Sequence, residues 1–410
     1  MTTSKQVVRT YLTLTLFSTL ANSLIWGINT LFLLDAGLSI AQTFAANAFF
    51  TLGQVLFEVP TGVVADLRGR RLSYLLGTMT LFATTIMYYL LWQVNGPFWA
   101  WAVVSALLGL GFTFFSGAVE AWLVDALQTT KYKGSLESVF AKGQMIAGGA
   151  MLTGSVAGGA LAQVTTLGVP FLVRSGLLLI TFAIAVVTLR DIGFTPDKQA
   201  KATTQVKNIF RASINHGLKN RPVRWLMLAA PFTAGAGIFA FYALQPYLLE
   251  LYGDPEAYGV AGLAAAIVAG AQIGGGLLVP VVRKAFKTRT SVLVLAIIVG
   301  TAMLLVFGLL SNFWVALIAI VIWAMTFSAS MPVRQAYLNG LIPSKQRATV
   351  LSFDALMGSA GAVGSQPLLG RAADVYSYST AYILTAALQL CALPFTLLAK
   401  REKTTNDIIS

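Results

Sequence analysis

The chain has 410 residues, of which 57% are hydrophobic and only 10% charged, and its formal net charge is +13. A soluble protein carries about 25% charged residues, so this composition excludes a soluble globular protein and indicates a chain solvated by lipid. The basic residues lie in short blocks between apolar runs rather than on one polar domain, which excludes nucleic acid as the expected partner.

Twelve apolar runs follow one another, and each is long enough for a helix that crosses the bilayer. About 20 apolar residues in a helix span the roughly 30 Å hydrocarbon core. The runs cover residues 7–34, 41–65, 72–94, 98–127, 137–163, 169–190, 223–250, 257–282, 290–311, 313–340, 348–370 and 378–399. The sequence therefore predicts an all-α membrane protein with twelve transmembrane helices in the lipid bilayer.

The gaps between these runs alternate in charge. The basic gaps contain Arg68, Arg70 and Arg71; Lys131 and Lys133; the segment 191–224; Arg283, Lys284, Lys287 and Arg289; Lys345 and Arg347; and Lys400, Arg401 and Lys403. The other gaps hold acidic or neutral residues, with Arg371 as the exception. By the positive-inside rule, this pattern predicts a multi-pass protein of the cytoplasmic (inner) membrane with both termini in the cytoplasm.

One long polar segment, residues 191–222, follows the sixth run. We expect it to be a cytoplasmic linker between an N-terminal six-helix bundle, residues 1–190, and a C-terminal one, residues 223–410. The halves also share short matches in the same order: Phe-Leu-Leu-Asp at 32–35 with Tyr-Leu-Leu-Glu at 247–250, Ala-Trp-Leu at 121–123 with Ala-Tyr-Leu at 336–338, and Ser-Val-Phe-Ala at 138–141 with Thr-Val-Leu-Ser at 349–352. Such repeats are usual in secondary transporters, so the two halves are predicted to be pseudo-symmetric.

Between the second and third runs, residues 62–71 read Gly-Val-Val-Ala-Asp-Leu-Arg-Gly-Arg-Arg. This segment resembles the cytoplasmic signature loop of the major facilitator superfamily, G-x-x-x-D-[RK]-x-G-[RK]-[RK], with Leu67 where a cation is usual. Gly62 permits close approach of helices, and Asp66 suits a neighbouring helix N-terminus, where the dipole favours an anion. The resemblance implies the fold of that family and a cytoplasmic gate. The gate would comprise Gly62, Asp66, Arg70, Arg71 and Asp125, the last being an acid near the end of the fourth span.

Residues 154–159, Gly-Ser-Val-Ala-Gly-Gly, resemble the G-P-x-x-G-G motif of exporters in that family, with Ser155 in place of the proline. Glycines in a span also permit a tight helix contact without any role in transport, so both interpretations stay open. The fourth span lacks the R-x-x-Q-G signature of drug–proton exporters, because Ser105 and Leu108 occupy its Arg and Gln positions.

Ionisable side chains inside spans are functional candidates, because burial in lipid costs about 2.5–3.5 kcal/mol on insertion scales. They are Glu58, Glu120, Lys142, Arg174, Arg334 and Asp354. Arg174 lies near the outer end of its span, so we expect it to extend to the membrane surface. One ion pair is predicted in each half, Glu120 with Lys142 and Arg334 with Asp354. Glu58 is predicted to be either a proton-coupling carboxylate or part of the gate.

In the fold that the resemblance implies, spans 1, 4, 7 and 10 line a central cavity. The candidate residues on these spans are Asn22, Trp26, Asn29, Phe115, Tyr242, Gln245, Trp323 and Phe327. Amide and aromatic groups without a central charge suit a neutral or amphipathic solute, and not a phosphate or dicarboxylate, which normally needs Arg or Lys. About half of these aromatic residues could equally serve packing or face lipid.

The sequence favours a secondary active transporter over two other classes. It contains no G-x-x-x-x-G-K-[ST] loop for an ATP-driven pump, and no metal cluster, midplane carboxylate pair or Ser/His pair that would indicate an enzyme. We expect proton-coupled export of small organic compounds, an antiporter that acts as a monomer without a bound cofactor or metal. Uptake or facilitated exchange of a small neutral metabolite is the alternative.

Overall fold

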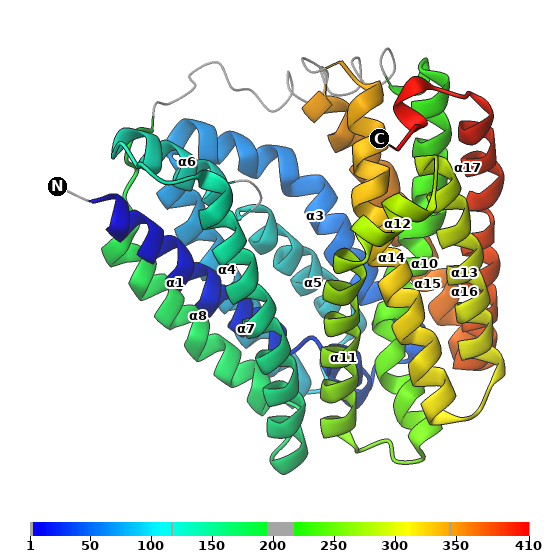
Figure 1. Ribbon diagram of the computed structural model, residues 1–410. Coiled ribbons are helices and arrows are strands. Elements are labelled where there is room, and N and C mark those ends of the chain that lie inside the picture. The colour runs from blue at the N-terminus through cyan, green and yellow to red at the C-terminus, as the bar shows by residue number, and fades with distance from the viewer. Residues whose placement is uncertain (1–2, 116–117, 195–216, 344–346, 410) are drawn as a thin grey trace. The chain divides into compact units, whose positions relative to one another are not determined.

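A computed structural model describes residues 3–115, 118–194, 217–343 and 347–409 (Figure 1). These residues form helices, and the β-type pairing among them is a bridge between Thr288 and Ile408. Within the described ranges, ten helical segments are long and apolar enough to cross a membrane. The predicted spans 7–34 and 348–370 are also helical but fall outside this set. The predicted all-α membrane fold is confirmed.

The helices of the first six predicted spans lie close to their expected bounds. They are α1 (Ser4–Ser23), α2 (Asn29–Asp35), α3 (Ile40–Arg68), α4 (Arg70–Gln93), α5 (Phe98–Thr113), α6 (Ala118–Thr129), α7 (Leu136–Val164) and α8 (Val169–Thr188). Within this half α1 lies beside α7 and α8, and α4 lies beside α5 and α8 (Figure 1).

The other six spans follow the predicted linker 191–222, of which residues 195–216 lie outside the described ranges and Arg221 already begins a helix. They are α10 (Arg221–Tyr252), α11 (Tyr258–Leu277), α12 (Val279–Ala285), α13 (Arg289–Leu309), α14 (Phe313–Leu341), α15 (Arg347–Val375), α16 (Tyr378–Leu390) and α17 (Ala392–Arg401), with a short 3₁₀ helix, η3 (Thr405–Asp407). The pair α10 and α15 and the pair α13 and α14 lie side by side.

Span 1 is not one helix but two, because α1 ends at Ser23 and α2 begins at Asn29. The backbone between them forms tight turns, in which the N–H of Trp26 donates to the carbonyl of Ser23 and that of Ile28 to the carbonyl of Ile25. Two other predicted spans are interrupted at a single residue, Leu278 between α11 and α12 and Cys391 between α16 and α17. The sequence pattern indicated the spans but not these breaks.

The chain divides into two compact units. The first comprises Met1–Gly37, Phe49–Gln205 and Glu256–Ala266, and the second comprises Leu38–Ala48, Val206–Pro255 and Ile267–Ser410. A short piece of each half is thus grouped with helices of the other half. Helix α3 begins in the second unit, where the ring of Phe44 lies 4.7 Å from that of Phe239 (centroid to centroid), and it ends in the first unit.

Each unit has a buried aromatic cluster at an equivalent place in the repeat. In the first unit the ring of Phe32 stacks on that of Phe171 with centroids 3.8 Å apart. In the second unit the ring of Tyr247, which corresponds to Phe32 in the repeat, packs on Phe307 and Tyr382 at 5.2 and 5.3 Å. Burial of such large rings supplies much of the packing energy of each bundle.

Candidate functional site

The signature loop brings three of its predicted charges together. The guanidinium of Arg70 lies 3.3 Å from the carboxylate of Asp66 and 3.4 Å from that of Asp125. Helix α3 presents Asp66 in its last turn, α4 begins with Arg70, and α6 carries Asp125. The cation therefore joins the ends of three helices within the first unit.

The segment that leaves α8 completes this loop, which the sequence did not indicate. The carboxylate of Asp191 accepts a hydrogen bond from the backbone N–H of Arg71 at 2.9 Å. Gly69 has a φ of 99°, and a Cβ there would overlap the Asp191 carboxylate. The ring of Phe194 lies 5.6 Å from the Arg70 guanidinium, a distance that permits a cation–π contact. The motif thus requires glycine at this turn both for its backbone angle and for space.

The other gate residues have local contacts of different kinds. The guanidinium of Arg71 donates to the backbone carbonyl of Val186 at 2.9 Å. A side chain placed at Gly62 would meet no heavy atom within 4 Å. Gly62 therefore does not sustain a close helix contact within the described first unit.

In the second unit Arg334 and Asp354 form a bidentate ion pair, as the sequence predicts. The two guanidinium nitrogens donate to the two carboxylate oxygens at 2.6 and 2.7 Å, and one of them also donates to the backbone carbonyl of Leu226 at 3.2 Å. Asp354 is 7% exposed. The pair neutralises both charges inside the bundle formed by α10, α14 and α15.

The corresponding prediction for the first unit is wrong. No ion pair joins Glu120 to Lys142 within the described residues, and both side chains are exposed. Glu120 lines a cavity together with Gly143 and Gln144 of α7, whereas Lys142 does not line it. Because each charge is accessible to solvent, neither needs the other for neutralisation.

The cavity that Glu120 lines has a volume of about 230 Å³ and lies within the first unit. Its wall is rich in hydroxyl groups, from Tyr11, Thr15, Ser18, Tyr74, Thr78 and Thr181, and in amides, from Asn22 and Gln144. Phe112 and Phe115 add aromatic surface, and the ring of Phe115 packs edge-on against Tyr74 at 4.9 Å. This wall offers many hydrogen-bond partners and one carboxylate.

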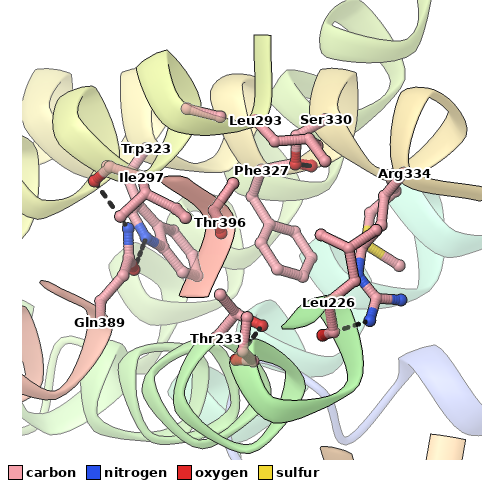
Figure 2. Close-up of a pocket in the computed structure, with 14 residues that line it drawn as sticks. Leu226, Thr233, Leu293, Ile297, Trp323, Phe327, Ser330, Arg334, Gln389 and Thr396 are labelled. Atoms are coloured by element: carbon pink, nitrogen blue, oxygen red, sulfur yellow. Dashed lines mark hydrogen bonds between the residues drawn. The ribbon is translucent and has the colours of Figure 1, made fainter. Parts of the chain in front are cut away.

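The second unit contains a smaller cavity of about 70 Å³, between α10, α13, α14, α16 and α17. The rings of Trp323 and Phe327 stack at 5.7 Å in its wall. Figure 2 shows the indole N–H of Trp323 donating to Gln389, and Arg334 donating to the carbonyl of Leu226 on another side of the cavity. The rest of the wall combines aliphatic side chains with the hydroxyl groups of Thr233, Ser330 and Thr396, so this cavity is more apolar than that of the first unit but not without polar groups.

The glycines of residues 154–159 pack against the break in span 1. A Cβ on Gly158 would overlap the backbone carbonyl oxygen of Leu24, and one on Gly154 would overlap the hydroxyl of Ser23. On the other side, a Cβ on Gly159 would lie 2.8 Å from the Cα of Gly262. These glycines are needed for close helix contacts within the first unit, which explains them without reference to the direction of transport.

The position of the Arg174 side chain differs from the prediction. It does not extend to the membrane surface but is 2% exposed, and its guanidinium donates to the side-chain oxygen of Asn22 at 3.2 Å. Among the described residues no carboxylate forms an ion pair with it, and its Nε has no hydrogen-bond partner. Asn22 lies in the last turn of α1, where the helix dipole favours a cation. The buried cation therefore lies directly behind the wall of the polar cavity.

The predicted cavity residues fall into two groups. Asn22 and Phe115 line the cavity of the first unit, and Trp323 and Phe327 line that of the second. The remaining four line neither of these cavities. Trp26 is 39% exposed within the span 1 break, Asn29 begins α2, Tyr242 packs on Phe241, and Gln245 is buried in α10.

Two units of repeated helices, each with an internal cavity, define the class of α-helical secondary transporters built from internal repeats. A sequence model of the Major Facilitator Superfamily matches residues 11–363 and 280–408. The chain belongs to the Major Facilitator Superfamily.

Known proteins support this assignment at two levels. An uncharacterized MFS-type transporter of Methanocaldococcus jannaschii is 24% identical over 197 residues, and the match covers about half of either chain, 48%. The nucleoside transporter NupG superposes with a TM-score of 0.78 at 11% identity, covering 96% of this chain and 98% of that one. A bacterial homolog of the human lysosomal transporter Spinster superposes with a TM-score of 0.73 at 15% identity, covering 98% of both. These structural likenesses are likenesses of fold.

Proposed function

We propose that this transporter moves small organic compounds, neutral or amphipathic, across the cytoplasmic membrane by proton-coupled export. The observation that carries the proposal is the polar cavity of the first unit, whose wall combines hydroxyl, amide and aromatic groups with the single carboxylate of Glu120. Such a wall can orient a neutral solute by hydrogen bonds and ring contacts. Its carboxylate can exchange a proton, because no ion pair with a described residue holds it.

Glu120 suits proton coupling better than Asp354 does. A coupling carboxylate has to lose and regain its proton during the cycle, and it needs access to water or solute for that exchange. Asp354 is buried and bound at both oxygens by Arg334, so it lacks this access. Glu58 is the second candidate, since it is a carboxylate exposed on α3 in the same unit.

Uptake or facilitated exchange of a small neutral metabolite is the competing proposal. The glycine contacts of α7 remove one argument for export, since they account for the exporter-like motif by packing alone. NupG transports nucleosides, which are small neutral metabolites, but a shared fold does not transfer a substrate. The direction of transport and the substrate are therefore to be determined by the transport assays below.

The substrate class is tested with a panel of organic compounds in cells that lack their major exporters. Expression of the chain should raise resistance to neutral or amphipathic compounds and lower their accumulation. In proteoliposomes with an imposed pH gradient, Glu120→Gln should abolish gradient-driven accumulation of a compound found in this way while exchange down its concentration gradient continues. The matched control is Glu137→Gln, an exposed acid in the first turn of α7 that does not line the cavity. Equal loss of gradient-driven accumulation in both variants, or no loss in either, would mean that Glu120 does not couple transport to protons. The same assay on Glu58→Gln tests the second candidate.

The proposed orientation is tested separately by cysteine labelling from outside the cell. The single native cysteine, Cys391, is exposed, so it is first replaced by alanine. A cysteine at Asn95, between α4 and α5, should then react with an impermeant reagent, whereas one at Lys133, between α6 and α7, should not. The reverse pattern would contradict cytoplasmic termini.

A further inference from the structure

A groove of about 690 Å³ runs along the N-terminal half of α1, away from the cavities described above. Its wall comes from α1, from the loop between α6 and α7, and from Ile146 of α7, all within the first unit. The chain carries three cations here, Lys5, Arg9 and Lys133, and none of the described residues that line the groove is acidic. All three side chains are exposed, and none forms an ion pair with a described residue.

The order of residues along α1 separates charge from apolar surface. Lys5, Arg9, Leu12 and Leu16 are spaced by four, three and four residues, so they share one face of the helix. The two cations occupy the first turns, and the two leucines follow. From Lys5 to Leu16 the helix rises ~17 Å at 1.5 Å per residue, close to half of the roughly 30 Å hydrocarbon core. One face of α1 thus matches the length and polarity of one lipid molecule in a single leaflet.

The loop that supplies the third cation is held in place by the chain itself. The hydroxyl of Ser4 donates to the carbonyl of Thr130 at 3.0 Å, which ties the start of α1 to this loop. A Cβ on Gly134 would lie 2.5 Å from the hydroxyl oxygen of Tyr132, so the absence of a side chain there leaves room for the tyrosine ring. Lys133 is therefore kept beside the first turns of α1.

We propose that this groove binds an anionic phospholipid, with the phosphate at Lys5, Arg9 and Lys133 and an acyl chain along Leu12 and Leu16. Basic pockets between transmembrane helices are suited to anionic head groups, and the apolar half of the groove favours a lipid over a soluble phosphate. The segment 195–216 is a poor alternative occupant, because its four cations, Lys198, Lys201, Lys207 and Arg211, outnumber its one acid, Asp197. By the predicted topology the lipid belongs to the cytoplasmic leaflet.

The test uses the full chain in a neutral detergent and compares binding of phosphatidylglycerol, phosphatidylcholine with the same acyl chains, and glycerol phosphate. Retained lipid is counted by native mass spectrometry, and affinity is taken from the rise in unfolding temperature on titration. We expect phosphatidylglycerol to bind and stabilise the wild type, phosphatidylcholine to do so far less, and glycerol phosphate not at all at the same concentrations.

Replacement of the three groove cations, Lys5→Gln, Arg9→Gln and Lys133→Gln, should weaken phosphatidylglycerol binding roughly a hundredfold. The matched control carries Lys284→Gln, Lys287→Gln and Arg401→Gln, which remove the same residue types and the same charge from exposed positions of the second unit. This control should bind like the wild type. Lys5→Arg, Arg9→Lys and Lys133→Arg should retain binding, since they keep the charge. The glutamine variant should unfold, without added lipid, at the temperature of the wild type, which separates lost binding from misfolding.

Three results would overturn the proposal. Equal weakening in the groove variant and the control would mean a diffuse charge effect rather than a site. Equal binding of phosphatidylglycerol and phosphatidylcholine would mean apolar adhesion only. Binding of glycerol phosphate as tight as that of phosphatidylglycerol would assign the cations to a soluble anion.

Discussion

Equivalent positions of the repeat line a cavity in both units, yet the two cavities differ in chemistry. On spans 1 and 7, Tyr11, Leu14 and Ser18 correspond to Leu226, Ala229 and Thr233, each pair differing by 215 in number. On spans 3 and 9, Tyr74, Thr78 and Leu81 correspond to Leu293, Ile297 and Gly300, each pair differing by 219. Two tyrosines of the first unit are thus leucines in the second, and a threonine is an isoleucine.

The two units also differ in whether their charged side chains form ion pairs. The first unit has an exposed carboxylate in its cavity wall, Glu120, and a buried guanidinium bonded to Asn22, that of Arg174, and neither forms an ion pair with a residue that the structure describes. The second unit has the same two kinds of group, but Arg334 and Asp354 neutralise each other. The cavities thus lie at equivalent positions of the two units, whereas the side chains that line them differ. The ion pair neutralises both charges inside the second bundle, whereas Glu120 keeps an accessible charge on the cavity wall of the first.

The largest expected effect tests the ion pair of the second unit. Arg334→Gln leaves the carboxylate of Asp354 buried without a cation, and removal of one partner of a buried pair costs about 3–5 kcal/mol. Chemical denaturation of the purified protein should show this loss in the free energy of unfolding. Glu120→Gln, at the unpaired carboxylate of the first unit's cavity, should change that free energy by less than about 0.5 kcal/mol, as for surface substitutions. The double variant Arg334→Met with Asp354→Leu should recover most of the loss, and a stable Arg334→Gln would contradict the comparison.

An intermediate effect is expected at the break of span 1, which has no counterpart in α10, where the corresponding residues 239–243 are continuous helix. Gly158→Ala places a methyl group against the backbone carbonyl of Leu24. Overpacking of this kind costs about 1–3 kcal/mol, and thermal unfolding should report it.

Gly149→Ala on the same helix is the control, because a Cβ there meets nothing within 4 Å. It should be neutral or stabilising by up to about 1 kcal/mol, since alanine favours the helix. Equal unfolding temperatures for the two variants would show that the backbone at the break moves to accommodate the added methyl group.

The smallest effect, and one of opposite sign, is expected at Arg174. Its counterpart in the repeat is Gln389, again 215 residues on, which is bonded to Trp323 and to the carbonyl of Ile297. Arg174→Gln removes a buried cation that has no carboxylate partner among the described residues, so the free energy of unfolding should stay constant or rise by about 1 kcal/mol. Transport of a compound identified in the panel should fall. A loss of stability above about 2 kcal/mol would instead mean that the guanidinium is needed to hold Asn22.

The spans were predictable because a helix that crosses the membrane requires a continuous run of apolar residues. The run 137–163 became α7, Leu136–Val164, and the run 313–340 became α14, Phe313–Leu341. The resemblance to the family's signature loop implied that Asp66, Arg70 and Asp125 belong to one gate, and the structure brings their charges together. The pairing of Arg334 with Asp354 followed from equal depth on neighbouring spans.

Features that depend on which way a side chain turns were not predictable. Arg174 lies near a span end in sequence, but its side chain points inward to Asn22. Lys142 and Gly143 are neighbours in sequence, yet only the glycine lines the cavity. The break at residues 24–28 leaves no mark in hydropathy, because these residues are as apolar as a helix would need. A glycine-rich face on another span, α7, is the signal that could have indicated it.

The exchange of short segments between units bears on how such a chain can be recombined. The residues 38–48 at the start of α3 pack with the second unit, and 256–266 at the start of α11 pack with the first. A chimera joined at the linker would therefore inherit a foreign patch on each bundle: Phe44 would face a new residue at position 239, and Gly262 would meet new neighbours at positions 27 and 159. Homologous halves are therefore interchangeable only where these two patches match, so an exchange at the linker should also keep residues 38–48 and 256–266 with the bundle on which they pack.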